Sequence, residues 1–162
     1  MSKDLNVTID GAKRGIIVAG APAPSGHYSH AVVANGLVFV AGQLPLDPST
    51  RAIPEGPEAQ TRLALANCAT ILKAAGSSLD DVVNTTVFVT DIGHWPAVNA
   101  VWSETFTNFR PARTVAVSHE LHFGCLVEIQ VTAVLTAGAA SSEPGKGRST
   151  DRVRPVAPDA LA

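Results

Sequence analysis

The segment from Asp81 to Asp91 (DVVNTTVFVTD) constrains the fold more than any other part of the chain. It is rich in β-branched residues and holds neither glycine nor proline, which is typical of a β-strand inside a sheet. Because side chains alternate across a strand, we predict that one alternate set points to one face of the sheet: Val83, Thr85, Val87 and Val89. The residues between them point to the other face.

The rest of the chain supplies two helices and several more strands. Pro57 suits the first turn of a helix, Gly76 suits its end, and Leu65, Cys68 and Leu72 recur at the spacing of one buried face. A second helix is predicted from about Trp95 to Phe109, with its inner side formed by Val98, Trp102, Thr105, Phe106 and Phe109. Strands are predicted at Gly15–Ala19, at His30–Val33 and Leu37–Gly42 around an Asn35-Gly36 turn, at Thr114–Ser118 and at Leu126–Leu135.

This order of elements predicts an α/β (α+β) fold: a single domain in which both helices cover one face of a mixed β-sheet. The other face also looks apolar, because Val87, Val89, Val131 and Val134 are available for it, and two helices cannot cover both faces. We therefore expect the chain to associate with copies of itself in a ring. The predicted domain spans residues 1–137, beginning with a loose lead-in of about 12 residues, and residues 138–162 are predicted to be a disordered tail.

Composition excludes some partners. The chain has 162 residues and a net charge of -2, so it lacks the basic surplus that would neutralise nucleic acid. No apolar run approaches the roughly 20 residues of a membrane span, and the N-terminus has no signal-peptide pattern. We expect a cytoplasmic protein without nucleic-acid or membrane partners, in which Cys68 and Cys125 are buried thiols.

Familiar catalytic motifs are absent from the sequence. It contains no GxSxG, GxxxxGK[ST], HExxH or GxGxxG pattern. The five histidines are scattered, and the pairs that lie three residues apart have no helix to bring them onto one face. We therefore predict no metal site.

Arg113 and Glu128 are the remaining candidates for chemistry. Arg113 comes directly before a predicted strand, and Glu128 lies inside the apolar run LVEIQV. A carboxylate in such a run lies on a wet face or is paired in a cleft. On these residues alone, a structural salt bridge and a functional site both remain open.

Seven segments, in order, resemble the sequence pattern of the RidA/YjgF family. Arg113 lies in one of them and Glu128 in another, and the resemblance covers about residues 15 to 136. Ala23–His30 resembles AP-x-x-GPYSQ, Phe39–Pro48 resembles FVSGQ-x-P-x-DP, and Gln60–Gly76 resembles the Q-T…N…AG helix. Thr86–Asp91 resembles the family's central strand, Val98–Trp102 resembles VN-x-x-Y, and Pro111–Thr114 and Val127–Ile129 complete the series.

The resemblance implies a chorismate-mutase-like fold, a homotrimer with sites between subunits, and hydrolytic deamination of reactive enamines and imines, such as 2-aminoacrylate. The implied products are a 2-keto acid and ammonia, and no cofactor is needed, because an imine is already electrophilic. Arg113 would grip the substrate carboxylate, and Glu128 would activate water and pass its proton to the leaving nitrogen. Tyr28, Asn99, Gly42 and Gln43 would help to hold the substrate.

Alternatives remain for individual residues and for the function. Alternatively, Tyr28 is a ring packed in a subunit interface and Asn99 is a structural amide. The alternative function is a non-catalytic trimeric module that binds small carboxylates or a partner protein. Such a module needs Arg113 but not Glu128. RNA cleavage, a further reading, is disfavoured by the charge balance.

Departures from the family pattern bear on the substrate. His27, His30 and His122 stand where the family usually has proline, glutamine and proline, and Ala41 replaces a serine. Val115 stands at the position of an often reactive cysteine, which argues against redox switching there. We predict that the three histidines contact a larger or doubly acidic enamine, for example one like 2-aminomuconate. Sequence drift without functional meaning is the alternative.

Overall fold

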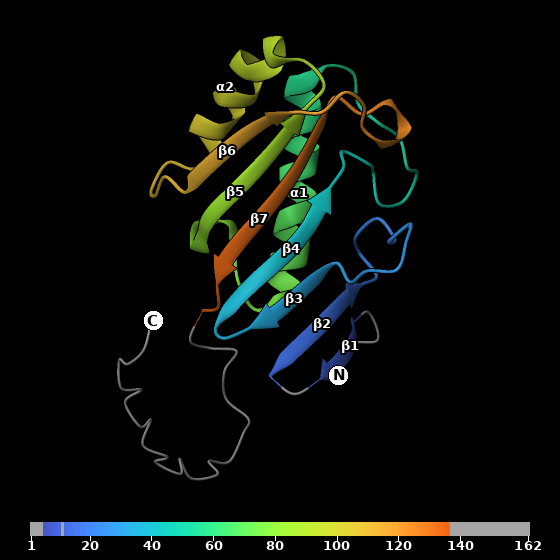
Figure 1. Ribbon diagram of the computed structural model, residues 1–162, viewed down its shortest axis with the longest axis vertical. Coiled ribbons are helices and arrows are strands. Elements are labelled where there is room, and N and C mark those ends of the chain that lie inside the picture. Colours follow the sequence, from blue (N-terminus) through green and yellow to red (C-terminus); the bar gives the residue numbers. More distant parts are fainter. Residues whose placement is uncertain (1–4, 11, 137–162) are drawn as a thin grey trace, which may run out of the picture.

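The computed structural model describes residues 5–10 and 12–136. They form a seven-stranded sheet in the order β1-β2-β3-β4-β7-β5-β6 (Figure 1). All neighbouring strands are antiparallel except β5 and β6, which are parallel. The strands are β1 Leu5–Asp10, β2 Lys13–Val18, β3 Ala31–Ala34, β4 Leu37–Gln43, β5 Val82–Val89, β6 Ala112–Val117 and β7 Val127–Val134.

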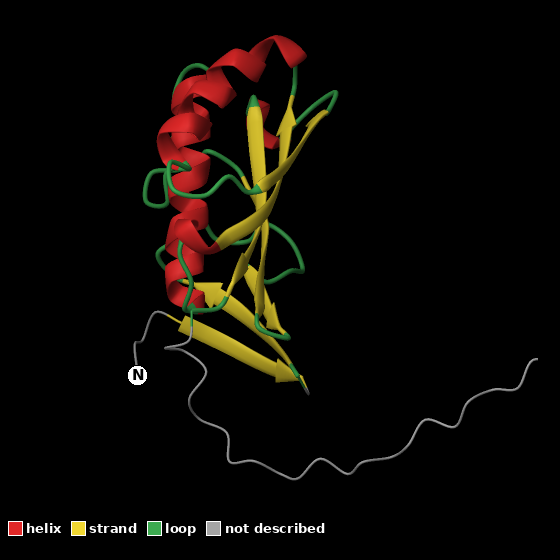
Figure 2. Ribbon diagram, turned by 90° about the vertical axis from the view of Figure 1, so that its left-hand side faces the viewer, coloured by secondary structure: helices red, strands yellow, loops and turns green. Residues whose placement is uncertain are grey.

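Two α-helices lie on the same face of this sheet (Figure 2). Helix α1 spans Pro57–Ala75 and joins β4 to β5, and helix α2 spans Trp95–Thr105 and joins β5 to β6. The second connection is a crossover between parallel neighbours, which requires a helix-sized link. The predicted α/β (α+β) single domain, with a mixed sheet and two helices on one face, is confirmed. The predicted tail, residues 138–162, lies outside the described residues.

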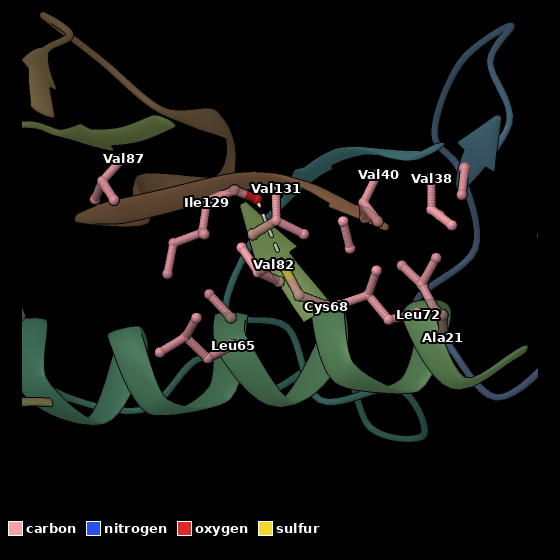
Figure 3. Close-up of a cluster of buried hydrophobic side chains, with 14 of the residues drawn as sticks. Ala21, Val38, Val40, Leu65, Cys68, Leu72, Val82, Val87, Ile129 and Val131 are labelled. Atoms are coloured by element: carbon pink, nitrogen blue, oxygen red, sulfur yellow. Dashed lines mark hydrogen bonds between the residues drawn. The ribbon is translucent and has the colours of Figure 1, made fainter. Parts of the chain in front are cut away.

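Helix α1 has the predicted limits, with Pro57 in its first turn and Gly76 in the left-handed conformation at its end (φ 90°). Its inner face packs on the central strands, as Figure 3 shows for Leu65, Cys68 and Leu72. The Cys68 thiol donates to the Ile129 carbonyl at 3.8 Å, and burial raises its pKa to about 12. The prediction of two buried thiols is confirmed, since Cys125 is also buried.

The predicted faces of β5 need a correction. Val82 is 1% exposed and Val83 is 37% exposed, so Val82 rather than Val83 lies on the buried side with Thr85. The cause is a β-bulge between Val82 and Asn84 where β5 pairs with β7, because an extra residue shifts the alternation by one.

The uncovered face of the sheet is also not the one predicted. Val87, Val89 and Val131 are at most 1% exposed and belong to the core under the helices. Of the valines expected on the open face, Val134 has an exposed side chain, at 43%. The other members of its alternate set on β7 are Glu128, Gln130 and Thr132, which are partly or fully exposed, so the open face is mixed rather than uniformly apolar.

Two predicted elements differ in extent. The prediction of a loose lead-in is wrong, because Leu5–Asp10 forms β1 and pairs along its length with β2. Helix α2 ends at Thr105 instead of Phe109. The chain must become extended before Pro111, because proline disfavours helix at the preceding residue, and Phe109 is consequently 56% exposed.

Candidate functional site

Arg113 on β6 lies between the two tryptophans of the chain. Its Cζ atom is 4.4 Å from the centre of the Trp95 ring and 5.0 Å from that of Trp102. Its Nη2 donates to Asn99 Oδ1 at 2.9 Å, while its Nη1 is buried without a hydrogen-bond partner in the described structure. Burial lowers the pKa of this guanidinium. The group is therefore held on three sides, and its Nη1 can still donate hydrogen bonds.

The three contacts come from one side of helix α2. Trp95, Asn99 and Trp102 follow one another at spacings of four and three residues, which places them on one helical face. That face meets β6 because β6 lies beside β5 at the edge of the sheet. Together with the segment that follows the helix, they line a cavity of about 620 Å³, whose further walls are Ser103, Phe106, Thr107, Arg110 and Pro111.

Glu128 on β7 lines a second cavity, of about 420 Å³. Its neighbours Val127 and Ile129 are fully buried in the core, so its own side chain points to the open face. Burial raises the pKa of Glu128, and the charge of His122 opposes that shift. The other residues that line the cavity are Ser25, Gly26, Tyr28, Ala41, Gly42, Leu44 and His122.

Gly42 is required by the position of this carboxylate. A Cβ atom on residue 42 would lie 3.0 Å from Glu128 Cδ and would overlap Oε1, so only glycine leaves room for the side chain. Gln43 is 5% exposed, and its amide donates to the Ala41 carbonyl at 3.0 Å and to the Gly42 carbonyl at 3.2 Å. Gln43 therefore holds the strand end that carries Gly42, and its amide nitrogen is directed at backbone.

Arg113 and Glu128 do not meet within one chain. Arg113 stands in register with Thr85, and Thr85 with Val131, and both of these side chains are 1% exposed on the helix side. Glu128 alternates with core residues and points to the opposite face. The structural salt bridge is therefore excluded within the chain. A single-chain pair of Arg113 and Glu128 is excluded with it.

The three predicted histidines occupy different environments. His122 lines the cavity of Glu128, whereas His27 lines another hollow, with Lys13 and Val32. His30 is 1% exposed. Its Nδ1 accepts from the Val18 amide at 2.8 Å, and its Nε2 lies 2.9 Å from the Pro22 carbonyl. The structure thus gives His30 a role in joining β2 to the following loop, and the residue also lines a small recess with Arg51 and Phe123.

Tyr28 borders the Glu128 cavity and the hollow of His27. Its ring is 48% exposed, and its hydroxyl accepts from the Ser25 amide at 3.4 Å. Both earlier readings of Tyr28, a substrate contact and an interface ring, fit this position. The Asn99 side chain accepts a hydrogen bond from Arg113, so within the chain it has the structural role of the two that were considered.

Trp102 was expected on the buried side of the helix, and no role was predicted for Trp95. The signal was present, because the chain has two tryptophans and both flank Asn99 at helical spacing.

Within residues 5–10 and 12–136, no group of three or more His, Cys, Asp or Glu side chains is placed to hold a metal ion. None of the described helices is long and apolar enough to cross a membrane.

Known proteins share this architecture. The sequence model of a family described as endoribonuclease L-PSP matches residues 18–135. A RutC family protein of Pyrococcus horikoshii is 40% identical over 122 residues, covering 75% of this chain and 97% of the relative. A goat protein named 2-iminobutanoate/2-iminopropanoate deaminase is 39% identical over 123 residues, covering 75% of this chain and 90% of the relative.

A solved structure agrees with these relatives. The crystal structure of the YjgF gene product from E. coli aligns with a TM-score of 0.71 and 35% sequence identity, covering 74% of this chain and 97% of that one. The matched region contains both cavities and all the residues that line them from Ser25 to Glu128. The chain therefore belongs to the RidA/YjgF family.

Proposed function

We propose that this protein is a hydrolytic deaminase of 2-imino acids and their enamine tautomers. The observation that carries the proposal is the geometry of Arg113. A guanidinium held by Asn99 and two aromatic rings, with Nη1 buried and unpartnered, is pre-organised to receive a carboxylate oxygen. The deaminase name of the goat relative supports the same chemistry.

We further propose that the complete site forms between subunits of a homotrimer. Arg113 and Glu128 lie on opposite faces of the sheet in one chain, so one chain supplies only half of the site to each cleft. The open face presents Phe39, which is 44% exposed, and Val134, which is 43% exposed. Covering such side chains with a second copy would bring its Arg113 towards Glu128 of the first.

The proposed reaction adds water to a C=N bond. Glu128 takes a proton from water while the oxygen attacks the imine carbon, and it passes this proton to the nitrogen, which gives a carbinolamine. Glu128 then takes the hydroxyl proton as the C=O bond forms and delivers it to the amine nitrogen as the C–N bond breaks, so that a 2-keto acid and ammonia leave. The raised pKa of Glu128 suits a group that must both accept and donate a proton near neutral pH. This reaction needs no cofactor, because the imine carbon is already electrophilic.

A second candidate, a non-catalytic module that binds carboxylates, is less well supported by the position of Glu128. A half-buried carboxylate in the cavity wall repels an anionic ligand and costs free energy on desolvation. A protein that only binds carboxylates would have a higher affinity without Glu128, whereas a hydrolase needs a general base at that position. We propose the cytoplasm as the place of action and expect no nucleic-acid substrate, given a net charge of -2.

A coupled assay tests the proposal. An L-amino acid oxidase with catalase forms 2-iminobutanoate from L-2-aminobutanoate, and ammonia release is followed with and without the protein. We expect wild-type protein to accelerate release, and Arg113→Ala and Glu128→Gln each to lose at least about a hundredfold of kcat/KM. Equal rates for wild type and both variants would exclude the deaminase.

A further inference from the structure

Two residues near the Glu128 cavity have backbones that side chains usually avoid. Arg51 has φ 61° and Phe123 has φ 62°. Asn35 is the other described non-glycine residue with positive φ, and an Asn-Gly turn accounts for it. A left-handed conformation is unfavourable for a residue that carries a side chain. Such conformations gather at functional sites, where a particular side chain is needed in spite of that cost.

These two residues contact each other although they lie far apart in the sequence. The Cζ atom of Arg51 is 5.4 Å from the centre of the Phe123 ring. Arg51 follows the β4 strand, and Phe123 lies in the short turn η3 (His122–Gly124) before β7. The two loops lie side by side at one end of the sheet (Figure 1). Both side chains remain exposed, so core packing does not explain the contact.

The two residues line a recess beside the Glu128 cavity. The recess has a volume of about 30 Å³, and His30 is another of its wall residues. It shares four wall residues with the Glu128 cavity, so the two hollows adjoin: Ser25, Tyr28, Gly42 and Leu44. Such a volume holds about two waters, which suits a carboxylate group and excludes a whole ligand.

Arg51 brings a positive charge to the wall of this recess. Asp47, the nearest acid before Arg51 in its loop, accepts hydrogen bonds from the amides and hydroxyls of Ser49 and Thr50, which hold its pKa far below the ordinary value. Among the described residues, no carboxylate forms an ion pair with Arg51. His122 adds a second basic group on the wall shared with Glu128.

We propose that Arg51, Phe123 and His122 form a subsite for the second acidic group of a dicarboxylic 2-imino acid. This proposal rests on the deaminase function proposed above. Arg113 of a neighbouring subunit takes the carboxylate next to the imine carbon, and Arg51 binds the distal carboxylate, with Phe123 holding the guanidinium in place by stacking. His122 lines the Glu128 cavity, with its ring 6.0 Å from that of Phe123, and contacts the chain that joins the two acid groups.

Two imines of similar length but different charge test the subsite. The oxidase forms 2-iminoglutarate from L-glutamate and 2-iminobutanoate from L-2-aminobutanoate. We expect wild-type kcat/KM to be at least about tenfold higher for 2-iminoglutarate, as a charge-assisted hydrogen bond allows. In Arg51→Gly, which suits the positive φ, the ratio falls to about one, while Lys73→Ala, which removes a positive charge from the exposed face of α1, leaves the ratio unchanged.

A binding measurement separates this proposal from the deaminase proposal. Titration with 2-oxoglutarate and 2-oxobutanoate is followed by tryptophan fluorescence, because both tryptophans flank Arg113. Tighter binding of 2-oxoglutarate that Arg51→Gly abolishes supports the subsite, even if neither imine is hydrolysed. Equal affinities for the two keto acids overturn the subsite, even if both imines are hydrolysed.

Discussion

The Glu128 side chain occupies the position that a side chain on residue 42 would take, where the end of β4 lies beside the start of β7. A Cβ atom on residue 42 would overlap Glu128 Oε1, so the carboxylate keeps its position only because residue 42 has no side chain. The cavity wall at this point is backbone, and the substrate can approach it closely.

Gly42→Ala should therefore damage catalysis more than folding. The added methyl group displaces the carboxylate by a fraction of an ångström or more, and we expect kcat/KM for imine hydrolysis to fall about a hundredfold. Gly20→Ala is the control, because its Cβ would meet nothing closer than Thr70 Cγ2 at 3.9 Å. Wild-type kinetics in Gly42→Ala would mean that Glu128 does not act from the position described.

Trp95 should set the affinity of Arg113 for the substrate carboxylate. Its ring lies 4.4 Å from the guanidinium carbon, and a cation–π contact contributes about 0.5–2 kcal/mol. We expect Trp95→Leu to raise KM about threefold to thirtyfold with a smaller change in kcat, and Trp95→Phe to stay near wild type. If the leucine and phenylalanine variants have the same KM, stacking does not position Arg113.

His30 should contribute to the stability of the fold. Both of its ring nitrogens face backbone groups of the same chain, and the ring is 1% exposed. His30→Ala leaves the buried Val18 amide without its acceptor, and we expect the free energy of unfolding to fall by about 2–4 kcal/mol. Urea unfolding at one fixed protein concentration measures this. His27→Ala, at an exposed position, should change it by less than about 0.5 kcal/mol.

Elements with a strong periodic pattern could be predicted from the sequence, whereas irregular features such as β-bulges could not. The limits of α1 follow from Pro57, Gly76 and one apolar stripe, and the structure reproduces them. Val82 and Val83 exchange faces because a β-bulge interrupts β5, and nothing in a run of β-branched residues marks the bulge. The structural role of His30 could not be predicted, because its backbone partners, Val18 and Pro22, are brought to it only by the fold.

The relation of Arg113 to Glu128 could not be predicted from the sequence for a similar reason. Alternation within a strand says which residues share a face, but only the register between strands fixes which face that is. Arg113 shares a row with Thr85 and Val131, while Glu128 points to the other side. The family resemblance supplied both residues, and the structure shows that one chain keeps them apart.

The pH dependence of stability should reveal the burial of Glu128. Burial raises the pKa of this carboxyl in the folded state, so the folded protein keeps the proton to a higher pH than the unfolded chain. Stability is then lost as pH rises through the folded pKa. We expect Glu128→Gln to have a higher Tm than wild type at pH 7 and the two Tm values to converge below about pH 4.

Glu104 provides a control of opposite sign. Its pKa is lowered by Arg62, whose Nη1 lies 2.7 Å from Glu104 Oε2. Stability from this pair is present above the unfolded pKa and is lost as pH falls. Glu104→Gln should therefore have a slightly lower Tm than wild type at pH 7 and approach it in acid. A Tm for Glu128→Gln below that of wild type at pH 7 would show that Glu128 is stabilised as a carboxylate.

The central claim is that Arg113 of one subunit acts with Glu128 of another, and mixing two inactive variants tests it most directly. Arg113→Ala and Glu128→Ala are co-expressed with different tags, and assemblies that carry both tags are isolated and assayed for imine hydrolysis. In a trimeric ring that holds both variants, one of the three interfaces joins an intact Arg113 to an intact Glu128. We predict recovery of about a third of wild-type activity, and a mixture as inactive as its parents would contradict the account.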